Sequence, residues 1–495
     1  MRSFSLLVLM VAGAMAADPT DPAGAERLIQ INDAHWVERE ASRFAAALGQ
    51  DPVPVRRRIA ERLYRSRDLN GIDTLRPALL WWRTDSGPLT ALIPLKDRRI
   101  FCDGFGVDQP PMVRVGEREG TVVYTQNLPS GLREYRLLAV EDVAVIARSV
   151  DEVHRLVPRI PNLLVTDPAL PALRMVVRGP ALREALTIPP WLPLPRLPAS
   201  ALDPRPALKA LGDWVAQESL YLSVDVRAVN TTHARLTLQL KAKPDSELAS
   251  WITSQQHQAT RIAGLVEKPT TALVATARIN WNGRLDSLSD HLGASQRATV
   301  PGVWSPAVEE SWRQVWRLAD RIGEMAMAID ETPDGGYVTT SICEQPRATE
   351  QVTHLNALAT GATGDAGRSG EISGTPVMVR MVNGRTEATA AGARHIIAVT
   401  AAGSAAATAA DNAVQLAISA AQVVPPRGTP GILVIRADIG RLVRLLPGAN
   451  RENEIPPAPM VGLLTVRPGN VLQFEVTVPL EPAALALSRL PHGWW

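Results

Sequence analysis

The sequence predicts an α+β protein with two tandem related units, each a mainly antiparallel sheet with helices on one face. Two observations carry this prediction. Short strands that follow one another through tight turns recur along the chain, without the regular β-α-β alternation of a parallel doubly wound sheet. The order of predicted elements in residues 76–265 is also found again in residues 266–495, which indicates an internal repeat.

Length and composition limit the classes of protein that fit. The chain has 495 residues, more than the roughly 100–200 residues of one typical domain. Its hydrophobic fraction of 46% and charged fraction of 21% are those of a globular protein. These values exclude a largely disordered chain, a collagen-like repeat and a polytopic membrane protein. With 52 basic and 50 acidic residues, no global charge attracts nucleic acid, and no nucleic-acid partner is expected.

The N-terminus predicts export. A basic start at Arg2, an apolar stretch from Phe4 to Val11 and the small residues Ala14 and Ala16 form a signal peptide over residues 1–16. The apolar stretch is shorter than the roughly 20 helical residues that cross a bilayer. We therefore expect no transmembrane span after cleavage and a periplasmic or extracellular location. The alternative is a buried N-terminal helix.

The first half of the mature chain begins with an N-terminal helical segment, residues 17–75, and continues with the first α+β unit, residues 76–265. The segment is predicted to hold helices at Ala25–Leu48 and Val53–Arg67. In the unit, Ser149 and Glu152 form a capping box that begins a helix. The other elements are strands at Leu79–Arg83, Thr90–Leu95, Met112–Val115, Thr121–Thr125, Arg136–Val140, Val143–Ala147, Leu173–Val177, Leu220–Val226 and Ala234–Leu240, and helices at Arg98–Phe105, Ala181–Leu186 and Ser246–Leu265.

The second unit, residues 266–495, has a leading strand and a helix that begins at Ser305-Pro306. Ser404 is expected to cap a helix through Ala420, as Ser149 does in the first unit. The remaining strands are Met325–Ile329, Tyr337–Cys343, Val377–Val382, Thr386–Ala390, His395–Thr400, Ile432–Arg436, Val461–Val466 and Leu472–Val478, with helices at Ala348–Ala359 and Ile439–Leu446. Matched positions of the two units are separated by similar numbers of residues: 248 between Gly87 and Gly335, and 253 between Val143 and Ile396.

Four segments of the chain give a resemblance to a known family. They are Gly71 to Pro77, Leu92 to Asp97, Val143 to Val150 and Leu220 to Val229. In these segments the chain resembles a family of uncharacterised secreted bacterial proteins with a duplicated α+β unit. The resemblance lies in the pattern of strands and turns, and the family assigns no catalytic residues, so no functional residue transfers to this sequence.

The motifs of several common chemistries are absent from the sequence. No His-Glu-x-x-His zinc motif, Gly-x-Ser-x-Gly elbow or Ser-x-x-Lys motif occurs. The glycine-rich stretch Gly361–Gly367 lacks the Lys-Ser/Thr of a phosphate loop and predicts a helix-to-strand loop. We therefore predict no catalytic, cofactor-binding or metal residues and no cofactor. Cys102 and Cys343 are too few for a disulfide scaffold. Two separate, buried thiols are expected, and a disulfide between them is the alternative.

The predicted partner contact lies in the proline-rich stretch 188–198, whose spacing favours extended chain. Its apolar side chains are Trp191, Leu192, Leu194 and Leu197, and they need a burial site, either in their own unit or on a neighbour. Arginines between Arg56 and Arg67 make the helix Val53–Arg67 basic, which suits a solvated face or an anionic surface. The partner is thus expected to be an unidentified envelope protein or surface, and peripheral membrane contact stays open.

Two hypotheses of function follow. The first is an exported cell-envelope protein that acts as a non-catalytic binding or structural module, supported by duplication, export and the missing catalytic motifs. The second is a secreted hydrolase whose dispersed active site lies between the two repeats. The first is preferred, so the chain is expected not to be an enzyme.

The signal peptide makes a prediction of its own. Cleavage after Ala16 should give a mature chain that begins at Ala17, which mass spectrometry of the protein from its native host would detect. An intact Met1 on the protein from a cytosolic fraction would contradict export.

Overall fold

The structure is a computed structural model. It describes residues 26–47, 51, 53, 69–82, 90–103, 113–118, 121–127, 133–138, 142–147, 149–165, 167, 169–186, 205–255, 257–281, 293, 305–334, 336–363, 367–382, 384–422, 430–445 and 456–489. The signal peptide 1–16, most of the helix predicted at Val53–Arg67 and the proline-rich stretch 188–198 lie outside these residues.

Helices and one large antiparallel sheet make this a mixed α+β protein, as predicted. The sheet holds twenty strands within the described residues, and each neighbouring pair among them is antiparallel. The N-terminal half contributes β1 (Arg27–Ile31), β2 (Ala78–Trp82), β3 (Thr90–Pro94), β4 (Val113–Arg118), β5 (Thr121–Asn127), β6 (Arg133–Leu138), β7 (Val143–Ala147), β8 (Leu173–Arg178), β9 (Ser219–Ala228) and β10 (His233–Ala242). The C-terminal half contributes β11 (Thr271–Arg278), β12 (Glu324–Glu331), β13 (Tyr337–Glu344), β14 (Arg368–Ile372), β15 (Thr375–Val382), β16 (Arg385–Ala391), β17 (His395–Ala401), β18 (Leu433–Asp438), β19 (Pro459–Arg467) and β20 (Val471–Pro479).

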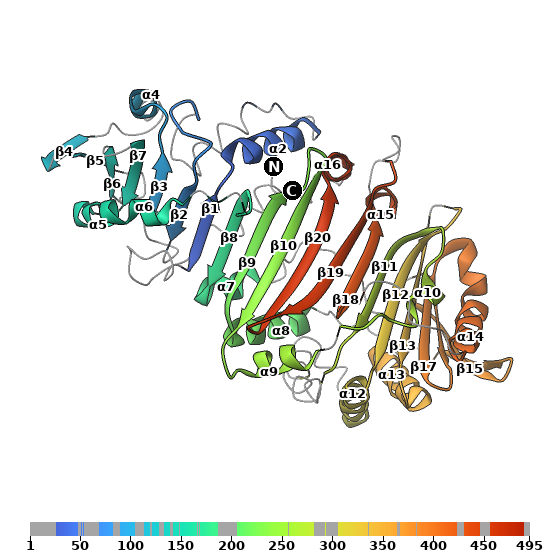
Figure 1. The fold of residues 1–495 in the computed structure, drawn as a ribbon. Helices are drawn as coiled ribbons and strands as arrows, with labels where there is room; N and C mark the ends of the chain where they lie inside the picture. The colour runs from blue at the N-terminus through green and yellow to red at the C-terminus, as the bar shows by residue number, and fades with distance from the viewer. Residues whose placement is uncertain are drawn as a thin grey trace.

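The two halves of the sheet have the same internal strand order. The first is β4-β5-β6-β7-β3-β2-β1-β8-β9-β10, and the second is β14-β15-β16-β17-β13-β12-β11-β18-β19-β20. The halves meet where β10 pairs with β20, from His233 opposite Pro479 to Lys241 opposite Val471. The two sheets expected from the sequence are therefore one continuous sheet that runs across the whole molecule (Figure 1).

The helices connect the strands of each half. Those of the first half are α2 (Ala34–Ala47), α4 (Arg98–Asp103), α5 (Val150–Leu156), α6 (Ile160–Leu163), α7 (Gly179–Ala185), α8 (Arg205–Glu218), α9 (Glu247–Ser254) and α10 (Ala263–Val266), with a 3₁₀ turn at Val157–Arg159. Those of the second half are α12 (Pro306–Ala319), α13 (Ala348–Thr363), α14 (Ala409–Ala420), α15 (Ile439–Leu445) and α16 (Leu480–Arg489), with a 3₁₀ turn at Gly403–Thr408.

One face of the sheet is apolar from the first half to the second, and we call it the apolar face. A row of cross-strand neighbours on it consists of Ile146, Ala91, Leu80, Ile29, Met175, Val224, Leu238, Phe474, Leu464, Leu433, Ala277, Met325, Cys343, Ile396 and Ala391. Helices α2, α4, α7, α8, α9, α13, α15 and α16 pack on this face, through residues such as Trp36, Phe101 and Leu248. Burial of this continuous apolar surface holds the two halves under one helical layer.

The second face changes its character along the sheet. A row of its cross-strand neighbours consists of Val145, Leu92, Leu79, Gln30, Arg174, Asp225, Thr237, Glu475, Leu463, Val434, Thr276, Ala326, Ile342, Ile397, Ala390 and Val377. The row is apolar at both ends and polar in the middle. Helices α5 and α6 cover one apolar end, and α10 and α14 cover the other.

Helices thus lie on both faces of the sheet, and the prediction of helices on one face was wrong. The reason is visible in β3 and β7, which are buried at every position. A strand without exposed alternate positions needs cover on both sides, as in a parallel α/β sheet. The central strands alternate between apolar and polar side chains and need cover on one side only.

Three further expectations need correction. Arg27–Ile31 is strand β1, where a helix from Ala25 was expected, and helix α2 begins after Asp33, whose side chain accepts from the Trp36 amide at 2.7 Å. The helix expected over Ser246–Leu265 ends at Ser254, because Gln255 turns away to exchange hydrogen bonds with the main chain of Asn280. Ser404 does not cap α14. Its amide and hydroxyl donate to Asp334 in the β12–β13 turn, and α14 begins after Thr408.

Other local predictions are confirmed. Ser149 accepts from the amide of Glu152 and caps α5, and Ser305 does the same for α12 through the amide of Val308. The hairpin of β12 and β13 lies around the predicted Pro333-Asp334 turn. No described helix is both long and apolar enough to cross a membrane.

A glycine near the junction of the two halves tests the packing of the apolar face. A Cβ atom at Gly462 would lie 2.6 Å from Cζ of Phe474, so Gly462→Ala should cost about 1–3 kcal/mol of unfolding free energy through overpacking. Gly370 in β14 has no heavy atom within 4 Å of its Cβ position, so Gly370→Ala is the matched control. Urea unfolding of both variants measures the difference, and equal stability would contradict the close packing of Phe474.

Candidate functional site

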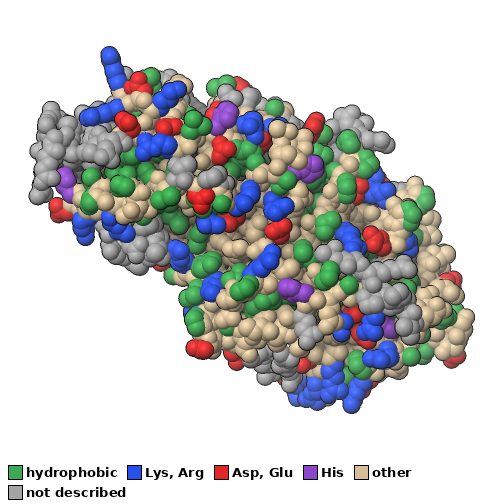
Figure 2. Space-filling view, in the orientation of Figure 1, with side chains coloured by type: hydrophobic (Ala, Val, Ile, Leu, Met, Phe, Trp, Pro, Cys, Tyr) green, Lys and Arg blue, Asp and Glu red, His purple; other side chains and the backbone are tan. Residues whose placement is uncertain are grey.

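The polar middle of the second face is the candidate site. We define the open face as the side chains of β8, β9, β10, β20 and β19 on this side of the sheet. The helices that pack on these strands, α7, α8, α9, α15 and α16, all do so through the apolar face. Figure 1 shows the five strands crossing the centre of the molecule, and Figure 2 shows basic and acidic side chains interspersed over them.

Alternation along the strands produces the open face. Leu236, Leu238 and Leu240 of β10 point to the apolar face, so Thr237, Gln239 and Lys241 point to the open face. The same pattern holds in β9 and β20. The open face is accessible at its margin, where Arg227 and Arg235 are exposed and Val461 keeps 46% of its surface in solvent.

The rows of the open face have distinct chemistry. One row places Ser223, Gln239, Gln473 and Thr465 side by side, and the Gln239 amide donates to Oε1 of Gln473 at 3.0 Å across the junction. The row towards the β9–β10 turn holds Arg227, Arg235 and Thr477. The row at the opposite margin holds Arg178, Tyr221, Lys241 and Arg467. Neutral amides and hydroxyls thus lie between two basic margins.

Ion pairs occupy both carboxylates of the open face. Arg174 forms a bidentate pair with Asp225, at 2.8 and 2.7 Å, and the hydrogen bond to Asp225 raises the pKa of the Arg174 guanidinium while burial opposes the rise. Glu475 lies 3.5 Å from Nε of Arg235 and accepts from Gln473 at 3.3 Å. Arg227 donates to the carbonyl of Ala169 at 2.5 Å.

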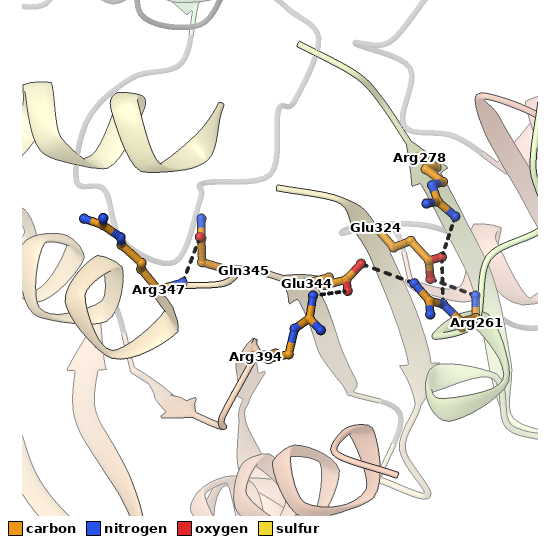
Figure 3. Close-up of polar contacts among 7 residues, drawn as sticks. All are labelled: Arg261, Arg278, Glu324, Glu344, Gln345, Arg347 and Arg394. Atoms are coloured by element: carbon orange, nitrogen blue, oxygen red, sulfur yellow. Dashed lines mark hydrogen bonds and ion pairs between the residues drawn. The ribbon is translucent and has the colours of Figure 1, made fainter. Parts of the chain in front are cut away.

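A second polar group is the rim cluster, which we define as Arg261, Arg278, Glu324, Glu344 and Arg394 at one end of β11, β12 and β13 (Figure 3). Glu324 is 1% exposed and accepts from Arg278 at 3.2 Å and from the main-chain amide of Arg261 at 2.8 Å. Glu344 lies 3.8 Å from Arg261 and 3.4 Å from Arg394. The cluster therefore ties the segment around Arg261 to the ends of three strands.

The rim cluster has the chemistry of a structural network. Its carboxylates are paired with guanidinium groups, and removal of one buried partner would leave a charge without compensation. His395 lies beside it, opposite Glu344 in the β13–β17 register. Burial lowers the pKa of His395, and the negative charge of Glu344 opposes this effect.

A third group lies beneath α13 on the apolar face. Glu387 of β16 pairs in register with Arg380 of β15, and the two residues are 9% and 7% exposed. Nη2 of Arg380 donates to Oδ1 of Asn356 in α13 at 2.8 Å. Burial raises the pKa of the Glu387 carboxyl to about 7, and the positive charge of Arg380 opposes the rise. Glu387 is thus a buried carboxyl that titrates near neutral pH.

Trp191, Leu192, Leu194 and Leu197 lie outside the described residues. Cys343 is a free thiol on β13, and burial raises its pKa to about 11, so it is a poor nucleophile. Among the described residues, no group of three or more His, Cys, Asp or Glu side chains is placed to hold a metal ion.

Sequence reasoning missed the open face, although a signal was present. The segments Leu236–Lys241 and Leu472–Thr477 alternate strictly between apolar and polar residues, which indicates a sheet with one solvated face. Thr237 and Glu475 are 238 residues apart, and only the β10–β20 register brings them together.

Comparison with known proteins adds little to this description. Neither a known protein family nor a curated protein sequence matches the chain. The solved structure of TP0453 in crystal form IV aligns with 48% of this chain and 99% of its own, at 12% sequence identity and a TM-score of 0.27. A TM-score of this size supports no argument about fold or function.

Glu387 makes the stability of the protein depend on pH. Its pKa is about 7 in the folded protein against an ordinary value of 4.5, so its contribution to stability is fully present below pH 4.5 and is lost as pH rises through 7. Within that window the free energy of unfolding should fall by at most about 1.4 kcal/mol per pH unit on account of this carboxyl.

Glu387→Gln should flatten this dependence, because an amide does not titrate. Urea unfolding of wild type and variant at a series of pH values measures the difference. Glu350→Gln is the control, because Glu350 lies exposed on α13 beside Arg347. An unchanged pH dependence in Glu387→Gln would contradict the assignment.

Proposed function

We propose that this chain is an exported cell-envelope protein that acts as a non-catalytic binding module, and that the open face is its binding surface. One observation carries the proposal. The row that runs from Val145 to Val377 has its charged side chains, Arg174, Asp225 and Glu475, where no described helix covers it. This face is exposed at Arg227, Arg235 and Val461, and a face of five strands can hold a ligand larger than a small metabolite.

We also propose that the two halves are related copies of one unit. Their strands have the same order, and their helices follow corresponding strands. In the first half α4 follows the third strand, α5 the seventh and α9 the tenth. In the second half α13, α14 and α16 follow the same three strands. The unit then begins at β1 and β11. For the first half this is earlier than residue 76, where the sequence pattern placed its start, and for the second half β11 is the leading strand expected in residues 266–495.

The junction of the halves supports binding over hydrolysis. A hydrolase of the expected kind would need a cleft between the two units to hold its dispersed residues. Main-chain pairing of β10 with β20 occupies that junction instead, from His233 to Lys241. Export is proposed from the N-terminal pattern of residues 1–16 alone.

A bulky substitution in the open face tests the proposal. Thr237→Trp adds a large side chain at the centre of the row without changing charge, and it should reduce the retention of envelope material on immobilised mature protein. Thr349→Trp is the matched control, because Thr349 is exposed on α13, which packs on the opposite face.

Equal retention by wild type, Thr237→Trp and Thr349→Trp would contradict binding through the open face. Thermal unfolding of the two variants checks that both keep the fold. Hydrolysis of a polymer in the envelope extract by the purified protein would instead favour the hydrolase.

A further inference from the structure

The open face concentrates positive charge. Its lysines and arginines are Arg174, Arg178, Arg227, Arg235, Lys241 and Arg467, and its carboxylates are Asp225 and Glu475. The difference of six minus two gives a charge of +4 on this surface, against +2 for the whole chain. The rest of the molecule therefore has a net negative charge, and an anion would be attracted to this face in particular.

Two arginines of the open face lie directly opposite each other. Arg227 on β9 and Arg235 on β10 are register partners, and like charges in this position destabilise a strand pair. Asp225, the nearest acid on the same strand, is held by Arg174 through both of its oxygens. Glu475 lies 3.5 Å from Nε of Arg235, and Arg227 donates to the carbonyl of Ala169, so this group of three charged side chains keeps a net positive charge. A further carboxylate beside Arg227 and Arg235 would balance that charge and accept charge-assisted hydrogen bonds from both.

The floor beside this pair suits the hydroxyl groups of a sugar chain. Thr477 continues the arginine row on β20, and the half-buried Thr237, Gln239 and Thr465 lie in the two rows beyond. Gln473, between Gln239 and Thr465, is buried and hydrogen-bonded to Gln239 and Glu475. Amides and hydroxyls both donate and accept hydrogen bonds, as sugar hydroxyls do. Tyr221 is the aromatic residue on the described open face, whereas single-stranded nucleic acids are held on several stacked aromatic side chains.

The helices on the same face leave a stretch of bare strands that suits an extended polymer as the ligand. Helices α5 and α14 pack on the two apolar ends of this face, and each stands roughly 10 Å above the strands. The described helices on this face therefore lie to either side of Arg227 and Arg235 and not over them. An extended polymer can lie on the strands between these helices.

We propose that the ligand of the open face is a polysaccharide with carboxylate groups, bound through Arg227 and Arg235 with its hydroxyls on the threonine and glutamine side chains. The proposal rests on the proposed binding function and names the class of ligand. The pairing of Arg174 with Asp225 one row away has the geometry that each sugar carboxylate would take on an arginine.

Binding to polygalacturonate and to neutral dextran of similar length tests this proposal. Wild type should bind polygalacturonate and not dextran, and the affinity should fall when salt is raised from about 0.05 to about 0.5 M. Arg227→Gln with Arg235→Gln should weaken binding at least about tenfold, as expected for two lost charge-assisted contacts.

Two arginines on the other side of the sheet provide the matched control. Arg313 on α12 and Arg347 just before α13 are half exposed, and their double substitution by Gln removes the same charge. This variant should bind polygalacturonate as wild type does. Equal weakening in both double variants would overturn the proposal, because the effect would then follow net charge alone.

Binding assays with other ligands distinguish the remaining outcomes. The protein could also bind single-stranded DNA or anionic phospholipid vesicles. If it binds either as tightly as polygalacturonate, with the same dependence on Arg227 and Arg235, the assignment of a polysaccharide ligand is overturned. If envelope material is retained in a manner sensitive to Thr237→Trp but polygalacturonate does not bind, the ligand class is wrong and the binding function stands. If neither is retained, both are wrong.

Discussion

The pairing of β10 with β20 is the constraint on which the rest of the structure depends. Side chains alternate between the faces of a sheet with a period of two, so the register of this pair decides which side of the second half continues the apolar face of the first. Leu238 opposite Phe474 makes the apolar faces continuous. A slip of one residue would turn Phe474 and Val476 towards solvent and would place Glu475 under the helices.

Once this register is set, the distribution of helices follows from the strands. Strands β3 and β7 are buried at every position and need two helical layers. The strands beneath α14 are apolar on the side that α14 covers. The central strands need one layer because their alternate residues are polar. The open face is thus the part of the sheet that no described helix covers, and the partly buried side chains of Arg174 and Asp225 compensate each other's charge there.

Local chemistry decided which parts of the fold could be predicted. The cap at Ser149, the turn at Pro333-Asp334 and the alternating strands near Leu236 depend on residues close in sequence, and these predictions were correct. Strand β1 was missed because five residues, Arg27–Ile31, lie beside a helical pattern and become a strand through pairing with β2 and β8. The open face was missed for the same kind of reason, since its residues come from strands 238 positions apart, as Thr237 and Glu475 are.

The junction also has the geometry of an isologous contact. Strands β10 and β20 hold the same place in their halves and pair antiparallel, which is what a two-fold axis between identical subunits produces. A polypeptide that ended after α9 would leave β10 as a bare edge strand, and two such polypeptides would associate through that edge as a symmetric dimer. Joining both halves in one polypeptide replaces this bimolecular association with an intramolecular one, so the pairing no longer depends on protein concentration.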